Sequence, residues 1–220
     1  MVMKRVMCYG DSLTWGFDPA SGMRFGPDQR WTALLAAAMP GITVIEEGLN
    51  GRTAGCDDPD ALSDRNGLHM LHSLLDSHQP LDAVILMLGV NDTKLGFNQS
   101  PYDIQKSMAG LIHIAQDPAC YRHTHHQLPK VLVVAPVAIG AGIKDNHPFP
   151  GIDMSSYRKS IALPKLYAQL AADHGCCYLD ANDYVQACTI DNLHMDAAGH
   201  QMMAAALQEK LTEMFKEEGL

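Results

Sequence analysis

Residues 5–14 read RVMCYGDSLT. The stretch begins with apolar residues at consecutive positions rather than at every second one, which is typical of a strand whose sheet is covered on both faces. A glycine, an acid and a hydroxyl follow directly, ending with Ser12. The stretch therefore predicts a parallel strand over residues 5–9 with polar groups where the strand ends.

The same apolar pattern recurs along the chain, at residues 42–46, 83–88, 130–135 and 176–179. Between these strands, apolar residues at three- and four-residue spacing predict helices over residues 31–39, 68–75, 104–115 and 163–171. A last helix has its apolar stripe at residues 207–215 and follows a cap at Asp196. Ser100 and Pro101 predict the start of the third helix, because serine caps a helix and proline fits its first turn. We therefore expect a three-layer α/β/α sandwich, flavodoxin-like, with about five parallel strands in one domain over residues 1–220.

Composition limits the classes of function. The chain has 220 residues, 47% of them hydrophobic, and a formal charge of −9, so disorder is excluded and neither nucleic acid nor an anionic membrane is expected as a partner. The longest apolar runs have about six residues, far short of the roughly 20 that span a bilayer. No signal peptide is recognisable. In a chain of this size without a recognisable export signal, the six cysteines are expected to be free buried thiols and the protein cytoplasmic. None of the cysteines has a C-x-x-C spacing.

Polar residues follow four of the predicted strands. Ser12 follows the first strand, Gly51 the second and Asn91 the third, while Asp191 and His194 come after the fifth. Since the carboxyl ends of parallel strands meet at one edge of a sheet, these groups are expected to lie together. A hydroxyl, an imidazole, an acid and amide donors are what acyl transfer through a serine nucleophile needs.

The residues around these positions resemble the four sequence blocks of the GDSL, or SGNH, hydrolase family. The blocks are Gly-Asp-Ser-Leu at 10–13, the loop around Gly51, Gly-Val-Asn-Asp at 89–92, and Asp-x-x-His at 191–194. The resemblance extends over essentially the whole chain, and it further resembles the bacterial arylesterase and acyltransferase branch. It implies the SGNH hydrolase fold and a serine esterase for short-chain, acetyl-type or aryl esters, with no metal or organic cofactor. It also implies acyl transfer to alcohols and assembly into a homo-oligomer.

Each catalytic role is expected from the chemistry of the residue and from this resemblance. Ser12 is the expected nucleophile, His194 the general base and Asp191 the acid that orients the imidazole. The resemblance places the oxyanion hole at the backbone N–H groups of Ser12 and Gly51 and at the side-chain amide of Asn91. Alternative interpretations are a helix cap for Ser12, a positive-φ turn for Gly51 and an Asx-turn for Asn91.

The substrate pocket is less well defined by sequence. Asp11 and Asp92 are interpreted as acceptors that tie loops together. The candidate substrate-binding residues are Asp11, Trp15, Lys94, Phe97 and Met195. The long segments 53–66 and 136–155 are candidates for pocket walls and for a subunit contact. The run His-Thr-His-His at 123–126 is not interpreted as a metal site, because no companion pair of ligands is apparent.

Other functions remain open at this stage. A carbohydrate acetylesterase or a thioesterase of the same family is compatible with the same blocks. A flavodoxin-type binding module would use residues 10–14 to hold a phosphate at a helix N-terminus. The carboxylate of Asp11 disfavours that module, since it would repel a phosphate.

Overall fold

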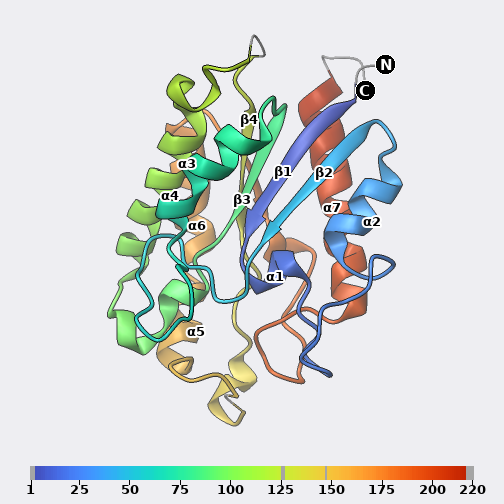
Figure 1. Cartoon of the computed structure of the whole chain (residues 1–220). Coiled ribbons are helices and arrows are strands. Elements are labelled where there is room, and N and C mark those ends of the chain that lie inside the picture. The colour runs from blue at the N-terminus through green and yellow to red at the C-terminus, as the bar shows by residue number, and fades with distance from the viewer. Residues whose placement is uncertain (1–2, 125–126, 147, 217–220) are drawn as a thin grey trace.

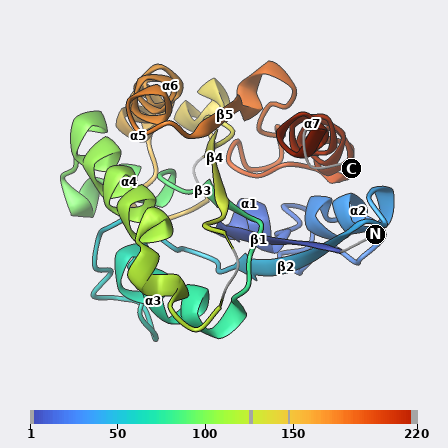
Figure 2. The same cartoon turned by 90° about the horizontal axis from the view of Figure 1, so that it is seen from above.

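The structure is a computed structural model, and it describes residues 3–124, 127–146 and 148–216. In these residues the strands form one parallel sheet in the order β2-β1-β3-β4-β5 (Figure 1, and Figure 2 for β5). The strands are β1 (Lys4–Gly10), β2 (Ile42–Gly48), β3 (Ala83–Met87), β4 (Lys130–Ala135) and β5 (Cys177–Asp180). The expected five parallel strands are confirmed, each within two residues of its predicted bounds.

Helices cover both faces of this sheet, which gives the expected three layers (Figure 2). One face packs against α2 (Trp31–Ala38) and α7 (Ala197–Phe215). The other face packs against α3 (Gly67–His78), α4 (Pro101–Gln116) and α6 (Leu163–Asp173). The α/β/α sandwich predicted from the sequence is therefore confirmed.

The two-sided burial explains the unbroken apolar runs. In β1, Val6 and Cys8 belong to the cluster under α2 and α7, whereas Met7 and Tyr9 belong to the cluster under α3, α4 and α6. All four side chains are fully buried. Successive side chains of a strand point to opposite faces, so a strand covered on both sides has no polar positions.

Two short helices were not expected from the sequence. They are α1 (Ser12–Trp15) and α5 (Met154–Ser160). The second begins inside the segment 136–155, where Asp153 caps it by accepting hydrogen bonds from the amides of Ser155 and Ser156. Both helices are too short to show a clear apolar stripe. The third predicted helix, by contrast, begins as expected, with Ser100 and Asp103 forming a reciprocal capping box.

The cysteine prediction is correct in part. All six cysteines are free, and Cys8, Cys56 and Cys120 are buried. Cys176, Cys177 and Cys188 are only partly buried, which corrects the expectation of core thiols. For the pair at 176–177, the reason is that β5 is an edge strand. No helix in the described part of the chain is long and apolar enough to span a membrane.

Candidate active site

Ser12 lies in the tight turn that follows β1. It is the first residue of α1, and the side chain of Asp11 caps this helix by accepting a 2.9 Å hydrogen bond from the amide of Leu13. Gly16 ends the helix with a left-handed φ of 88°, a conformation that glycine adopts at no steric cost. One helical turn is therefore fixed at both ends, and it holds the Ser12 hydroxyl at the carboxyl edge of the sheet.

His194 links Ser12 to Asp191. Its Nε2 atom lies 2.9 Å from the Ser12 Oγ, although 182 positions separate the two residues in the sequence. Its Nδ1 atom lies 2.6 Å from Oδ2 of Asp191. The side chains of His194 and Asp191 are each only 4% exposed. The three groups thus form one continuous chain of hydrogen bonds, buried at Asp191 and His194 and partly exposed at Ser12.

The environment of Asp191 favours its ionised form. Burial alone would raise the pKa of this carboxyl, but the hydrogen bonds from the ring and the amide of His194 and from the amide of Leu193 outweigh burial and lower it. A carboxylate at this position accepts a hydrogen bond from Nδ1 of the imidazole. The other ring nitrogen then faces Ser12 as an acceptor.

Gly51 occupies a turn that only glycine fits well. The amide of Arg52 donates a 3.0 Å hydrogen bond to the carbonyl of Leu49, and Gly51 is the third residue of this turn with a φ of 77°. That φ is characteristic of a type II turn. The interpretation of Gly51 as a turn glycine is compatible with a role for its amide, because the turn sets the direction of that amide.

Asn91 is held in place through its side chain. It begins a short 3₁₀ segment (Asn91–Thr93) after β3. Its Nδ2 atom donates to the carbonyl of Arg52 at 3.1 Å and lies 3.4 Å from Oδ2 of Asp11. The second distance is long for a hydrogen bond, so the carbonyl of Arg52 is the closer partner that orients the amide.

Of the two buried aspartates that the sequence suggested as ties between loops, Asp92 is the one that holds two loops of this edge together. Asp92 accepts hydrogen bonds from the amides of Ala54 (2.7 Å) and Gly55 (3.1 Å), which anchors the start of the segment 53–66. Burial raises the pKa of Asp11 to about 7, against the opposing hydrogen bond from Leu13 and with a further contribution from Asp92.

A cavity of about 560 Å³ opens in front of Ser12 and His194. Residues 58–60 and 149–152 contribute two of its walls, so both long segments expected to shape the pocket do so. Gly51 and Asn91 also line it. Ser12, His194, Gly51 and Asn91 therefore line one common space.

The structure separates the candidate substrate-binding residues into two groups. Lys94 and Phe97 line the cavity. Asp11 and Met195 are 1% and 0% exposed and lie in the interior, while Trp15 packs under the guanidinium of Arg24. None of these last three lines the cavity, and the expectation that they contact substrate is corrected for this reason.

Some cavity residues were missed by the sequence analysis. The rings of Phe17 and Phe149 lie 4.3 Å and 5.3 Å from the His194 ring, measured between centroids. Asn50 and Leu193 also line the cavity. Three of these residues are close in sequence to Ser12, Gly51 or His194, which was the available signal. Phe149 carried no such signal beyond its place in a predicted wall.

Comparison with protein families agrees with this geometry. Residues 8–202 match the model of the GDSL-like lipase/acylhydrolase family. The chain belongs to this family. Its membership confirms the resemblance noted from the sequence and the expectation of a carboxylic ester hydrolase. A comparison with curated proteins found no match.

Solved structures similar to this GDSL-like hydrolase include esterases. Est24, a carbohydrate acetylesterase from Sinorhizobium meliloti, is 37% identical, with a TM-score of 0.89. This match covers 96% of this chain and 100% of that chain. The native aryl esterase of M. smegmatis is also 37% identical, with a TM-score of 0.88, and the match covers 96% of this chain and 99% of that chain. A second carbohydrate acetylesterase family member from S. meliloti is 31% identical, with a TM-score of 0.88 and coverage of 97% and 100%.

Proposed function

We propose that this protein is a serine esterase in which Ser12, His194 and Asp191 form the catalytic triad. The observation that carries the proposal is the chain of hydrogen bonds at 2.9 Å and 2.6 Å that opens onto the cavity. His194 accepts the proton of Ser12 while the Oγ atom attacks the ester carbonyl. The same imidazole then donates that proton to the departing alcohol, and water releases the acyl group from Ser12 in the second half of the reaction.

The oxyanion of the tetrahedral intermediates is bound by three donors in this proposal. They are the backbone N–H groups of Ser12 and Gly51 and the Nδ2 of Asn91. Donors fixed before the reaction stabilise the developing charge without reorganisation, and losing one typically slows the reaction by about 10²–10³-fold. The carbonyl of Arg52 supports this role by orienting the Asn91 amide.

The substrates proposed are short-chain, acetyl-type or aryl esters. Support comes from the rings of Phe17 and Phe149 beside His194 and from the aryl esterase and carbohydrate acetylesterase relatives. Acetylated sugars are the second candidate, favoured by the S. meliloti relatives. Comparison of kcat/KM for acetyl, butyryl and octanoyl esters tests the acyl preference, and a preference for octanoyl would contradict it.

The decisive experiment is replacement of the nucleophile. Ser12→Ala should reduce hydrolysis of p-nitrophenyl acetate at least about 10⁴-fold, because the triad acts as a unit. Wild type should also form a covalent adduct with a fluorophosphonate, located on Ser12 by peptide mass spectrometry. Ser21→Ala, at an exposed serine, is the matched control and should behave like wild type. Activity close to wild type in Ser12→Ala would disprove the triad assignment.

Three finer properties are also proposed. Acyl transfer to alcohols should appear as a new ester product when an alcohol is added to the reaction. A homo-oligomer is supported by the exposed apolar side chains of Leu62 and Leu95 beside the cavity walls, and light scattering after size-exclusion chromatography measures it. A cytoplasmic location is supported by the six free cysteines, since thiols persist in reducing compartments.

A further inference from the structure

Arg52 is a buried arginine that directly follows the turn at Gly51. It is 2% exposed, and it does not belong to the lining of the substrate cavity. Burial lowers the pKa of its guanidinium. Burying a cation costs free energy unless other groups compensate for it, so a function besides packing is expected of this side chain.

The guanidinium of Arg52 joins the ends of two strands. Its Nη1 atom donates hydrogen bonds to the carbonyl of Gly10, at 2.9 Å, and to the carbonyl of Glu47. Gly10 ends β1 two residues before Ser12, and Glu47 lies next to the end of β2. The guanidinium carbon also lies 4.1 Å from the centre of the Tyr9 ring, a favourable cation–π contact. Arg52 therefore fastens the loop after β2 to the strand that leads to Ser12.

This guanidinium has no carboxylate partner. In the described ranges 3–124, 127–146 and 148–216, its hydrogen bonds go to those two carbonyls, and no ion pair joins it to an aspartate or a glutamate. Its Nε atom is buried and has no hydrogen-bond partner in the same ranges. A charged donor binds a carbonyl more strongly than a neutral donor does. The two strand ends are therefore what the cation holds.

The backbone of Arg52 contacts the other parts of the proposed oxyanion hole. Its carbonyl accepts the 3.1 Å hydrogen bond from Nδ2 of Asn91. Its amide donates to the carbonyl of Leu49 at 3.0 Å, which closes the turn that holds Gly51. Through its side chain and its backbone, Arg52 is thus linked to each residue proposed to supply an oxyanion donor: Ser12, Gly51 and Asn91.

We propose that Arg52 is the positioning residue of the oxyanion hole, which fixes the Gly51 turn and the Asn91 amide relative to the strand end before Ser12. This inference rests on the proposed function, because it concerns the donors proposed there. Arg52 does not touch the substrate and acts through those donors. Since oxyanion donors bind charge that develops only in the transition state, Arg52 should affect kcat rather than KM.

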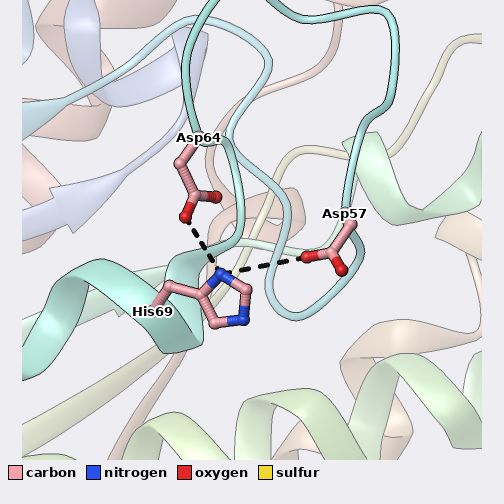
Figure 3. Close-up of side chains that lie close together, drawn as sticks. All are labelled: Asp57, Asp64 and His69. Carbon is pink, nitrogen blue, oxygen red and sulfur yellow. Dashed lines mark hydrogen bonds and ion pairs between the residues drawn. The ribbon is translucent and has the colours of Figure 1, made fainter.

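The groups of potential metal ligands do not include Arg52. Asp57, Asp64 and His69 come together along the segment 53–66 and the start of α3 (Figure 3), where Nδ1 of His69 lies 2.9 Å from Asp64 and 3.9 Å from Asp57. All three residues are exposed, and we base no proposal on them. The histidine-rich run at 123–126, for which no metal site was predicted, includes residues 125–126, which lie outside the described residues.

The test measures hydrolysis of p-nitrophenyl acetate by wild type, Arg52→Gln and Arg52→Lys. Arg52→Gln should lower kcat about 100-fold, the effect of displacing a catalytic group by about 1 Å, while KM changes less than about twofold. Both half-reactions pass through an oxyanion, so both should slow. Arg52→Lys should recover part of the loss, because lysine keeps a charged donor but lacks the planar fork of arginine.

Phenylboronic acid provides a readout that partial unfolding cannot produce. The Oγ atom of Ser12 bonds to its boron while the hydroxyl proton passes to His194, and the tetrahedral anion that forms occupies the oxyanion hole. Its inhibition constant should rise in each variant by about the factor by which kcat/KM falls. Because this constant is measured on the residual activity, it does not depend on the fraction of the protein that is folded.

Two variants serve as controls. Arg30→Gln makes the same change at an arginine that pairs with Glu46 at 2.8 Å and 2.9 Å, and His69→Ala removes the contact with Asp64. Both should keep the wild-type kcat and inhibition constant.

A wild-type kcat in Arg52→Gln would overturn the proposal. Loss of activity in Arg52→Gln with an unchanged inhibition constant would also overturn it, since Arg52 would then only stabilise the fold. Activity in Ser12→Ala, by contrast, would contradict the proposed function itself.

Discussion

Asp11 shows how strongly burial can change the pKa of a single side chain. It is 1% exposed, and burial raises its pKa from the ordinary 3.8 to about 7. A group with a raised pKa in the folded state stabilises the fold below its unfolded pKa, and this contribution is lost as the pH rises through the folded pKa. The ionised Asp11 therefore weakens the protein at neutral and alkaline pH.

Replacing Asp11 with asparagine should remove this dependence. Asp11→Asn keeps an oxygen that can accept the hydrogen bond from Leu13, but it cannot ionise. The free energy of unfolding of the variant, relative to wild type, should increase between about pH 4 and pH 7 and then level off. The increase is at most about 4 kcal/mol, from about 1.4 kcal/mol for each pKa unit.

Urea unfolding at several pH values measures this difference. Asp145→Asn, at an exposed carboxylate (77% exposed side chain), is the control and should show no comparable trend. A difference between Asp11→Asn and wild type that does not change with pH would show that Asp11 titrates like an ordinary aspartate.

Individual site residues could be predicted from the sequence where they stand in short motifs. Ser12, Asp191 and His194 stand in such motifs, and the structure brings them together. Phe149 could not be found in this way, because a contact between a loop and His194 depends on the three-dimensional path of the loop. Met195 was wrongly expected in the pocket because it follows His194 in the sequence, whereas its side chain lies in the core.

Among the elements, α4 allows a direct test of a cap predicted from sequence. Ser100 accepts a hydrogen bond from the amide of Asp103, and Asp103 accepts one from the amide of Ser100. Ser100→Ala should lower the free energy of unfolding by about 1 kcal/mol, because it leaves a helix amide without its acceptor. Esterase activity should not change.

Thermal and urea unfolding measure the loss, and Ser73→Ala provides the comparison at an exposed serine inside α3. Equal stability of the two serine variants would mean that solvent replaces the cap of α4 at no cost.

The elements themselves differ in how far the sequence could predict them. The long helices and the strands follow from apolar periodicity, because burial against the sheet imposes that periodicity. The helix α1 has only four residues, and it is created by the cap at Asp11 and the turn at Gly16 rather than by an apolar face. Such an element carries no periodic signal, although it positions Ser12.

At the scale of the whole molecule, strand order explains how distant residues meet. The position of β1 between β2 and β3 places the loops that follow these three strands side by side. Ser12, Gly51 and Asn91 come from those loops. His194 reaches the same edge from the far side of the sheet, after β5. The site therefore depends on the complete sheet rather than on any one local motif.

The same sheet makes the two halves of the core interdependent. Each strand contributes side chains to both faces of the sheet. The two core clusters therefore share one sheet, and neither can persist once that sheet is lost. We expect residues 1–220 to unfold as one cooperative domain. In the Trp15→Phe variant the fluorescence of Trp31, the buried first residue of α2, reports one face of the sheet. Far-ultraviolet circular dichroism also reports α3, α4 and α6 on the other face. The two signals and the loss of esterase activity should share one urea midpoint, whereas separated midpoints would reveal two folding units.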